Sequence, residues 1–192
     1  MKITIFGTFK PLNGGTTISL NEYRKILNLD ERFLFFDFAD SKKNNPLIFL
    51  FYFLKKIFLS KILSFHVSDK AAVKYLPFIY IFSKILGKKF VYRAFGGEII
   101  KTYQSLSKLN RFFIKNTILN SDIIYFQTKR IVKYFKPIVG DKCILKWLPT
   151  TRIDLYGGFL RNFPKKYIHI IYISRLTKEK GIVELINAVK DL

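Results

Sequence analysis

The residues whose types and spacing best suit chemistry are Arg175 and Lys180, in a short basic loop near the end of the chain. An apolar run at 167–173 precedes the loop, and Gly181 and an amphipathic pattern follow it. A strand that leads into a basic loop at a helix start is a common place for a bound phosphate. Arg offers a planar fork to phosphate oxygens, and Lys adds a point charge. Taken alone the loop is typical of a solvated turn, but its flanking patterns favour a phosphate site.

Two pairs of glycines mark further candidate ligand loops. Each pair follows an apolar run that we expect to be a strand, although neither has the spacing of a dinucleotide-binding loop. A glycine backbone can pass close to a ligand because no side chain stands in the way. A purely structural turn is the alternative for both pairs. The glycines are Gly14 and Gly15, before a helix that Thr16 is expected to cap, and Gly96 and Gly97.

Two titratable residues lie near the same predicted strand ends. Glu98 follows the second glycine pair and could accept a hydrogen bond from a substrate hydroxyl; the alternative is an acidic residue that starts a helix. His66 ends the third apolar run, where a base or ligand donor could stand, although a structural histidine is the alternative. Because the two histidines are distant and there is one cysteine, we expect no metal site. We expect no cofactor either.

These loops need a scaffold, and the hydrophobic pattern predicts one. Apolar runs alternate with helical patterns, which is typical of an α/β, Rossmann-like fold with a parallel sheet and helices on both faces. Such sheets bind ligands at the carboxyl ends of their strands. We expect strands at 2–6, 32–37, 62–66, 89–93, 123–126 and 143–148, and helices at 16–27, 46–60, 70–86, 106–119 and 129–135.

The same pattern predicts the domain organisation. Residues 1–150 are long enough for one complete domain, and 151–166 read as a linker because they lack clear periodicity. The strand and helix expected within 167–192 cannot bury a core by themselves. We therefore expect 167–192 to be the first part of an incomplete second domain.

Composition limits the partners. The formal net charge is +21, and hydrophobic residues make up 49% of the chain. Most of the basic residues are Lys rather than the Arg that reads bases, and no aromatic-basic recognition motif is present, so we expect no nucleic acid partner. The charge favours anionic lipid headgroups or phosphate-bearing substrates; biased genome composition is the alternative cause. The single Cys143 fits a reducing cytoplasm.

The segment 47–65 is the candidate for membrane contact. It is strongly apolar, but Lys55, Lys56 and Lys61 interrupt it, and its longest uninterrupted apolar piece is too short to span a bilayer. Apolar bulk with lysines beside it suits a helix lying on a membrane surface. The alternative is a core helix with a solvated edge.

In the segments quoted below, the chain resembles the retaining glycosyltransferases of the GT-B fold, family 4, also called glycosyl transferases group 1. The likeness runs along most of the chain, and its most specific part is YISRLTKEKGIVELINAV at the end. Looser matches are the first strand with Gly14–Gly15, FHVSD (65–69), KKFVYRAFGGE (88–98), SDIIYFQT (121–128) and KWLPTTRID (146–154).

The resemblance implies an acceptor-binding domain and a donor-binding domain that face a cleft. It implies that Arg175 and Lys180 hold the donor diphosphate, with Gly14, Gly15, His66, Gly96, Gly97 and Glu98 near the substrate cleft. Three features depart from the family pattern: Phe95 replaces a frequent histidine, Pro149–Thr150 replaces Pro-Asn, and the paired glutamates of the second domain are absent.

The expected function is therefore transfer of a sugar, with retention, from a nucleotide-sugar to a hydroxyl of a saccharide or lipid-linked acceptor. The nucleotide-sugar would be a co-substrate, and the context would be cell-envelope or capsular polysaccharide synthesis at the inner face of the cell membrane. Without the acidic pair, the 192 residues alone are expected to be inactive. The alternative is a non-catalytic, basic membrane-surface binding module that keeps only the acceptor domain.

Overall fold

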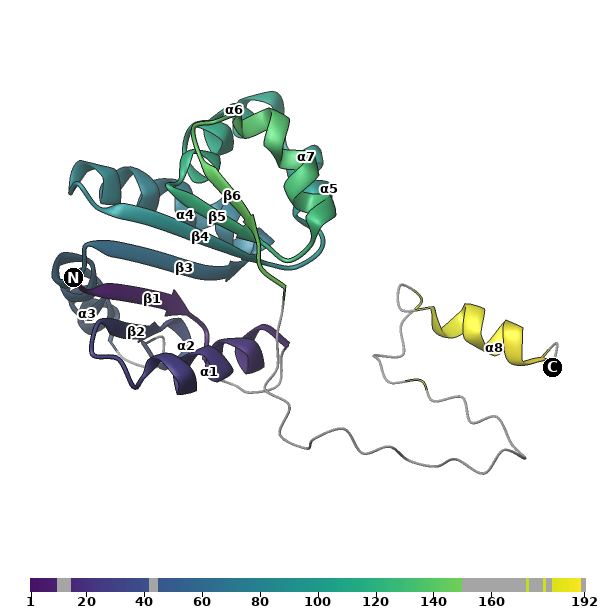
Figure 1. The fold of residues 1–192 in the computed structure, drawn as a ribbon, viewed down its shortest axis with the longest axis horizontal. Helices are drawn as coiled ribbons and strands as arrows, with labels where there is room; N and C mark the ends of the chain where they lie inside the picture. The colour runs from purple at the N-terminus through teal and green to yellow at the C-terminus, as the bar shows by residue number, and fades with distance from the viewer. Residues whose placement is uncertain (10–14, 42–44, 150–171, 173–177, 179–180, 191–192) are drawn as a thin grey trace. The chain divides into compact units, whose positions relative to one another are not determined.

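Six parallel strands form one sheet in the order β2-β1-β3-β4-β5-β6 (Figure 1). The computed structural model describes residues 1–9, 15–41, 45–149, 172, 178 and 181–190. The chain divides into two compact units, Met1–Ile153 and Asp154–Leu192, and the sheet belongs to the first. The strands are β1 (Ile3–Gly7), β2 (Phe33–Asp37), β3 (Ile62–Ser68), β4 (Lys89–Phe95), β5 (Ile123–Phe126) and β6 (Ile144–Trp147).

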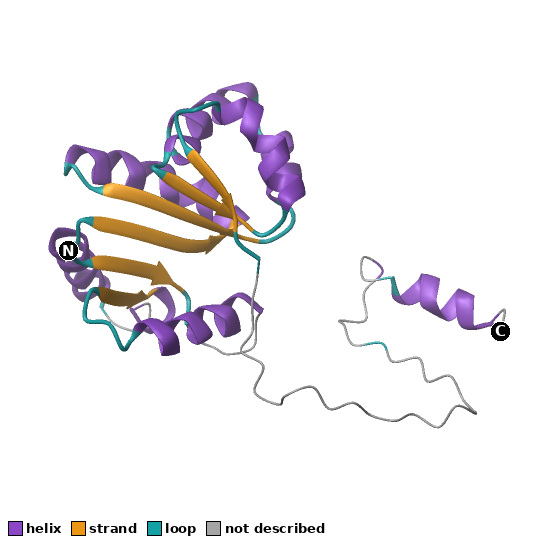
Figure 2. Ribbon diagram, in the orientation of Figure 1, coloured by secondary structure: helices purple, strands orange, loops and turns teal. Residues whose placement is uncertain are grey.

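Helices connect successive strands, as parallel pairing requires (Figure 2). In the first unit they are α1 (Gly15–Leu27), α2 (Phe38–Ser41), α3 (Pro46–Leu59), α4 (Asp69–Ile85), α5 (Ile99–Ser105), α6 (Lys108–Asn116) and α7 (Lys129–Val139), with a 3₁₀ turn at Ile118–Asn120. Local chemistry sets several of their ends. Asn45 caps α3 ahead of Pro46, and the side chains of Ser107 and Thr128 accept backbone N–H bonds at the starts of α6 and α7.

Alternate strand residues face two separate cores. The larger core lies between the sheet and α3 to α7, and its centre is a row of phenylalanines on neighbouring strands. Phe6 is in register with Phe36 and Phe65, and its ring stacks on that of Phe65 with centroids 4.5 Å apart. The smaller core contains Ile5 and Phe95 from the sheet and Leu20 from α1. Helices thus cover both faces of the sheet.

The fold class predicted from the hydrophobic pattern is confirmed. All six expected strands of the first unit are present, with ends that differ by at most two residues. The helical prediction for 106–119 was too simple. An unpredicted helix, α5, ends at Ser105, and the chain is extended at Leu106 before α6 begins at Lys108. The short α2 was also not predicted. Because α1 begins at Gly15, Thr16 lies inside the helix rather than capping it.

The interpretation of 47–65 as one surface helix is wrong. α3 ends at Leu59, and Ile62 begins β3, whose residue Phe65 is fully buried in the larger core. This break agrees instead with the separate helix and strand expected at 46–60 and 62–66. Within 47–65, α3 therefore remains the candidate for membrane contact.

In the second unit, the structure describes α8 (Ile182–Lys190), which confirms the helical pattern after Gly181. Gly181 has a φ of +78°, in the left-handed region that favours glycine. The expected linker 151–166, the expected strand 167–173, and the residues Gly14, Arg175 and Lys180 lie outside the described residues. The reading of 167–192 as the start of a donor domain stays a prediction.

Candidate functional site

The strand order reverses between β1 and β3, because β2 lies on one side of β1 and β3 to β6 lie on the other. In open α/β sheets, ligands bind outside the carboxyl ends of the strands at such a switch point. Gly7 pairs with His66 at this edge. A Cβ at Gly7 would lie 2.7 Å from the Leu20 side chain, so glycine here lets α1 pack close to the strand end.

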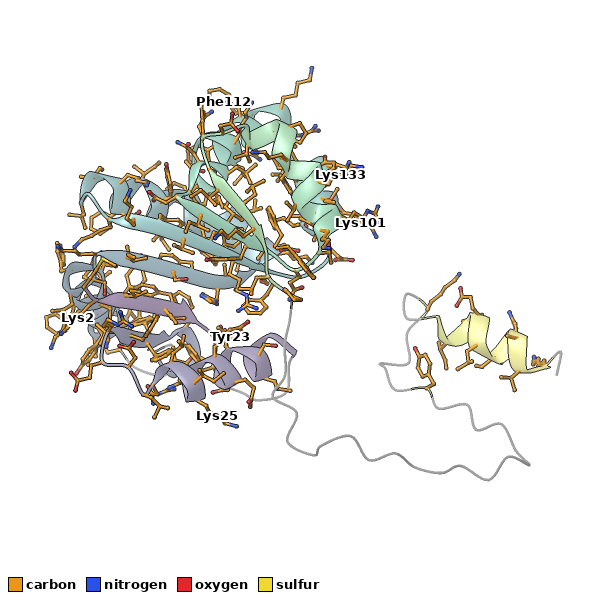
Figure 3. All side chains as sticks on the ribbon, viewed as in Figure 1. Lys2, Tyr23, Lys25, Lys101, Phe112 and Lys133 are labelled. Atoms are coloured by element: carbon orange, nitrogen blue, oxygen red, sulfur yellow. The ribbon has the colours of Figure 1, made fainter. Side chains whose placement is uncertain are left out.

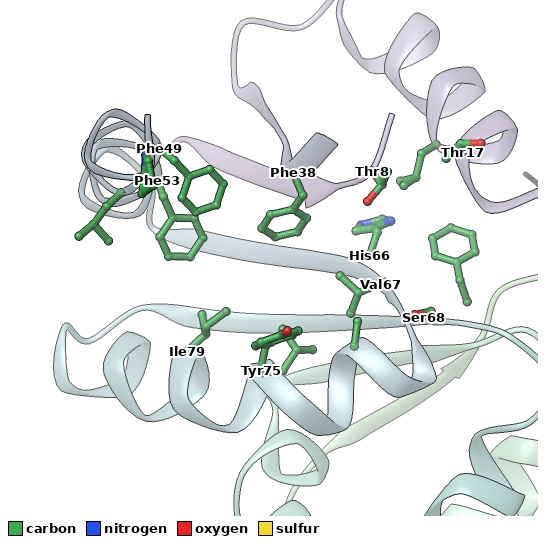
Figure 4. A pocket seen from close by; sticks show the side chains of 16 residues that line it. Thr8, Thr17, Phe38, Phe49, Phe53, His66, Val67, Ser68, Tyr75 and Ile79 are labelled. Carbon is green, nitrogen blue, oxygen red and sulfur yellow. The ribbon is translucent and has the colours of Figure 1, made fainter. Parts of the chain in front are cut away.

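A cavity of about 780 Å³ opens at this switch point and extends between α3 and α4 (Figure 4). Phe49 and Phe53 of α3 line one end, and Thr8, His66 and Thr17 lie at the other, with Phe38 between them. A volume of this size is typical of small-molecule sites, which are mostly apolar with a few polar groups. The remaining lining residues are Leu20, Pro46, Leu50, Val67, Ser68, Ala71, Tyr75, Leu76, Ile79 and Phe95.

His66 stands at the polar end of the cavity, within β3 and two residues before its end. Its Nε2 lies 2.9 Å from the hydroxyl of Ser64, whereas its Nδ1 is buried without a hydrogen-bond partner. Burial lowers the pKa of His66 to about 3, and the positive charge of Arg93 adds to this effect. The imidazole is therefore neutral at physiological pH, and it can donate or accept one hydrogen bond to a ligand.

Arg93 lies beside His66 on β4 and is only 1% exposed. Its guanidinium carbon is 4.3 Å from the ring centroid of Tyr23 and 4.8 Å from that of Phe95. One terminal nitrogen, Nη2, is 3.5 Å from the carbonyl oxygen of Pro149, and Tyr23 also forms a hydrogen bond to the side chain. Burial lowers the pKa of Arg93. No carboxylate among the described residues pairs with this cation.

The loop Gly96–Gly97–Glu98 follows β4 and is held by a buried carboxylate. Asp69, the first residue of α4, is 6% exposed and accepts a hydrogen bond from the backbone N–H of Glu98. The N–H of Gly96 donates to Oε1 of Gln127, 3.3 Å away. Gly96 has a φ of +139°, and a Cβ there would lie 2.7 Å from an oxygen of Asp69. Glycine is thus required at 96 by backbone conformation and by space.

Asp69 is also electrostatically unusual. Burial raises the pKa of its carboxyl group to about 6, and the charge of Glu98 adds to the rise, while the hydrogen bond from the Glu98 backbone opposes it. One carboxylate oxygen, Oδ1, and the hydroxyl of Tyr92 are both buried without a hydrogen-bond partner. The carboxylate oxygen can accept a hydrogen bond and the tyrosine hydroxyl can donate one, so a bound water or a ligand hydroxyl could pair with both.

The structure brings most of the predicted substrate-cleft residues to one edge of the sheet. His66 lines the cavity, and Gly96, Gly97 and Glu98 directly follow Phe95, which also lines it. Gly15 is the first residue of α1, whose Thr17 lines the same cavity. Glu98 stands at the N-terminal boundary of α5, but its side chain makes no capping hydrogen bond. Among the described residues, no three His, Cys, Asp or Glu side chains cluster closely enough to hold a metal ion.

Sequence analysis missed Asp69, Arg93 and the apolar walls of the cavity. A signal for Arg93 did exist: it is a charged residue inside a strand whose neighbours are otherwise apolar or aromatic. Asp69 carried no such signal, because an acidic residue at a helix start is common. The cavity walls come from α2, α3 and α4, and only the packing of those helices places them opposite one another.

Comparison with known proteins adds no relative: no family model matches the chain, and neither curated proteins nor solved structures give a match. Fold and site together therefore define the class of protein, a Rossmann-like α/β unit with an amphipathic cavity at its switch point.

Gly96→Ala should destabilise the protein strongly, by about 2–4 kcal/mol, because the variant forces a strained φ and a clash with Asp69. Gly97→Ala is the matched control. No atom lies within 4 Å of a Cβ at Gly97, and its φ is not positive, so its unfolding free energy should change by less than about 0.5 kcal/mol. Urea unfolding of both variants measures the difference; equal losses would contradict the account of this loop.

His66 and Asp69 should give opposite pH dependences of stability. The native pKa of His66 lies below its usual 6.5, so the histidine contributes stability above pH 6.5 that is lost as pH falls toward 3. The native pKa of Asp69 lies above its usual 3.8, so the aspartate favours folding below that pH, and this is lost as pH rises through 6. Between pH 4 and 6 the two trends largely cancel.

When one of the two residues is replaced by a group that does not titrate, the pH dependence of stability that the other residue causes should no longer be cancelled. In His66→Gln, the unfolding free energy should fall with rising pH relative to wild type, and in Asp69→Asn it should rise. The limit for one proton is about 1.4 kcal/mol per pH unit. Urea midpoints at pH 4.5, 5.0, 5.5 and 6.0 give the slopes. Parallel curves for wild type and both variants would show that neither group titrates abnormally.

Proposed function

We propose that this chain binds the acceptor in a retaining glycosyltransferase of the GT-B type, and that the acceptor is a saccharide linked to a lipid. The observation that carries the proposal is the cavity at the switch point, which joins an apolar channel to a polar edge. A lipid-linked saccharide has the same two parts, a hydrocarbon chain and a polar head. The resemblance of the sequence to family 4 supplies the reaction.

The apolar part of the cavity suits a hydrocarbon chain. Phe38, Phe49 and Phe53 face Tyr75 and Ile79 across it, with no charged side chain among the lining residues. Burial of apolar area contributes about 25 cal/mol per Å², so a chain in this channel would supply much of the binding energy. The same channel gives a free sugar no hydrogen bonds over most of its length.

The polar edge suits the saccharide head. Glu98, Thr8 and Ser68 lie at or beside the carboxyl ends of β4, β1 and β3, and carboxylates and hydroxyls are the usual partners of sugar hydroxyls. In the proposed reaction, the acceptor oxygen bonds to C1 of the donor sugar as the bond from C1 to the phosphate oxygen breaks. The hydroxyl proton leaves with the nucleoside diphosphate, which Arg175 and Lys180 would hold.

The alternative function, a basic membrane-surface binding module, is supported by a different feature, the exposed apolar side chains of three helices. α3, α4 and α6 expose many large apolar side chains, and we call this set the apolar patch. Phe78 of α4 contacts Phe113 of α6, with ring centroids 6.0 Å apart. The patch consists of Leu47, Ile48, Leu50, Phe51, Tyr52, Phe58 and Leu59, of Tyr75, Phe78, Ile81 and Ile85, and of Leu109, Phe112 and Phe113.

Exposed apolar side chains that gather on surface helices are typical of a contact with a protein or membrane. With a net charge of +21, an anionic membrane surface is the partner we propose. Lysines also project outward elsewhere, as Lys101 and Lys133 do from α5 and α7 (Figure 3). None of the described helices is long and apolar enough to cross a bilayer. Both proposals therefore place the protein at the inner membrane surface, where a lipid-linked acceptor is found.

The transferase proposal predicts saturable binding of decyl glucoside, a soluble stand-in for a lipid-linked sugar. Ala71→Trp should weaken this binding at least tenfold, because the larger side chain fills the cavity that Ala71 lines. Leu29→Trp is the control, since Leu29 is 91% exposed and does not line the cavity. Calorimetry below the micelle-forming concentration measures both. Equal affinity in the two variants, or no binding to wild type, would sink the acceptor assignment.

The membrane proposal predicts flotation of the chain with anionic vesicles, weakened by salt and by neutral lipid. Replacing Phe51 and Phe78, exposed at 63% and 66%, with Ser should reduce vesicle binding about tenfold or more through lost apolar burial. Leu29→Ser removes an exposed apolar residue outside the patch and should change nothing. Equal binding to anionic and neutral vesicles would remove the electrostatic part of the proposal.

A further inference from the structure

Arg93 is a buried charged residue that has no role in the acceptor site proposed above. A guanidinium removed from water is costly unless its hydrogen bonds and its charge are matched. At 1% exposure, Arg93 has two nitrogens, Nε and Nη1, with no hydrogen-bond partner. The rings of Tyr23 and Phe95 attract the cation but do not satisfy these N–H groups. The side chain is therefore short of an anion that accepts hydrogen bonds.

A second unpaired group lies next to it. His66 and Arg93 are register partners on β3 and β4, and they lie on the same face of the sheet, opposite the larger core. The Nδ1 of His66 is buried without a partner, as are Nε and Nη1 of Arg93. His66 and Phe95, the two neighbours of Arg93, both line the polar end of the cavity. Two potential donors thus stand side by side where the apolar channel ends.

We propose that Arg93, with His66 beside it, binds the phosphate of an amphipathic ligand whose hydrocarbon chain occupies the cavity between α3 and α4. This inference rests on the lipid-linked acceptor proposed above and adds a phosphate between its chain and its sugar. The order along the site is then chain between α3 and α4, phosphate at Arg93, and saccharide near Gly96–Glu98. An arginine fork suits phosphate oxygens because it presents several N–H groups in a plane.

Tyr23 of α1 packs over the guanidinium. It is half-buried, and its ring centroid lies 4.3 Å from the guanidinium carbon of Arg93. For a phosphate to reach the guanidinium, the Tyr23 side chain would have to turn away from it. The phosphate then replaces the ring as the partner of the cation.

The test compares three ligands on the 192-residue chain: decyl phosphate, decanol and inorganic phosphate, each below its micelle-forming concentration where it has one. Wild type should bind decyl phosphate ten- to a hundredfold tighter than decanol, which matches one or two charge-assisted hydrogen bonds. In Arg93→Met, the two affinities should become equal. Binding of decyl glucoside to wild type tests the acceptor proposal by itself, so a failure of the phosphate site is distinguishable from a failure of the acceptor proposal.

Arg24→Met is the matched control. Arg24, also on α1, lies over the rings of Phe9 and Phe35, at 5.5 and 5.7 Å, but it does not line the cavity. The variant removes the same charge and a similar pair of ring contacts, and it should keep the preference for decyl phosphate. The melting temperature of Arg93→Met should equal or exceed that of wild type, because an unpaired buried charge has been removed.

Three results would overturn the proposal. Wild type might bind decyl phosphate no more tightly than decanol, and this comparison needs no variant to fold. Arg93→Met might retain the preference for phosphate, which would place the anion elsewhere. Inorganic phosphate might bind as tightly as decyl phosphate, which would assign the site to a free phosphate group rather than to an amphipathic ligand.

Discussion

The register of the parallel strands is the constraint on which the rest of this molecule depends. Phe36, Phe6 and Phe65 stand side by side on β2, β1 and β3, and all three are at most 5% exposed. A shift of one residue in any of these strands would turn its phenylalanine to the opposite face of the sheet. The row therefore fixes the strands at heights where Gly7, His66 and Arg93 reach the same edge.

At this edge, the two faces of the sheet carry different kinds of side chain. On the side of the larger core, residues of α3 and α4 diverge enough to leave an apolar cavity rather than a closed interface. On the side of α1, Arg93 and His66 place buried polar groups beside the opening. An apolar channel and a buried cation at one strand edge are costly as pure structure. They are understandable as halves of a site for an amphipathic anion.

The Asp69 carboxyl group both holds a loop of the candidate site and affects the stability of the protein. It accepts the backbone N–H of Glu98 and lies against Gly96, so it fixes the loop that follows β4. Its burial is unfavourable for the charged form, which is why its pKa rises. A loop held by a carboxylate whose charged form is destabilised by burial is typical of a functional site, where local stability is lower than it could be.

The sequence by itself determined the α/β class, the six strands and the edge of the sheet that His66 and the Gly96–Glu98 loop adjoin, because alternating strand and helix patterns leave few other topologies. It also placed the break between α3 and β3, whose ends there lie within one residue of those expected. Only the tertiary structure decided that Arg93 is buried, with no carboxylate partner in the described part of the chain, and that α3 and α4 enclose a cavity. Those properties depend on contacts between residues far apart in the chain, which no local pattern records.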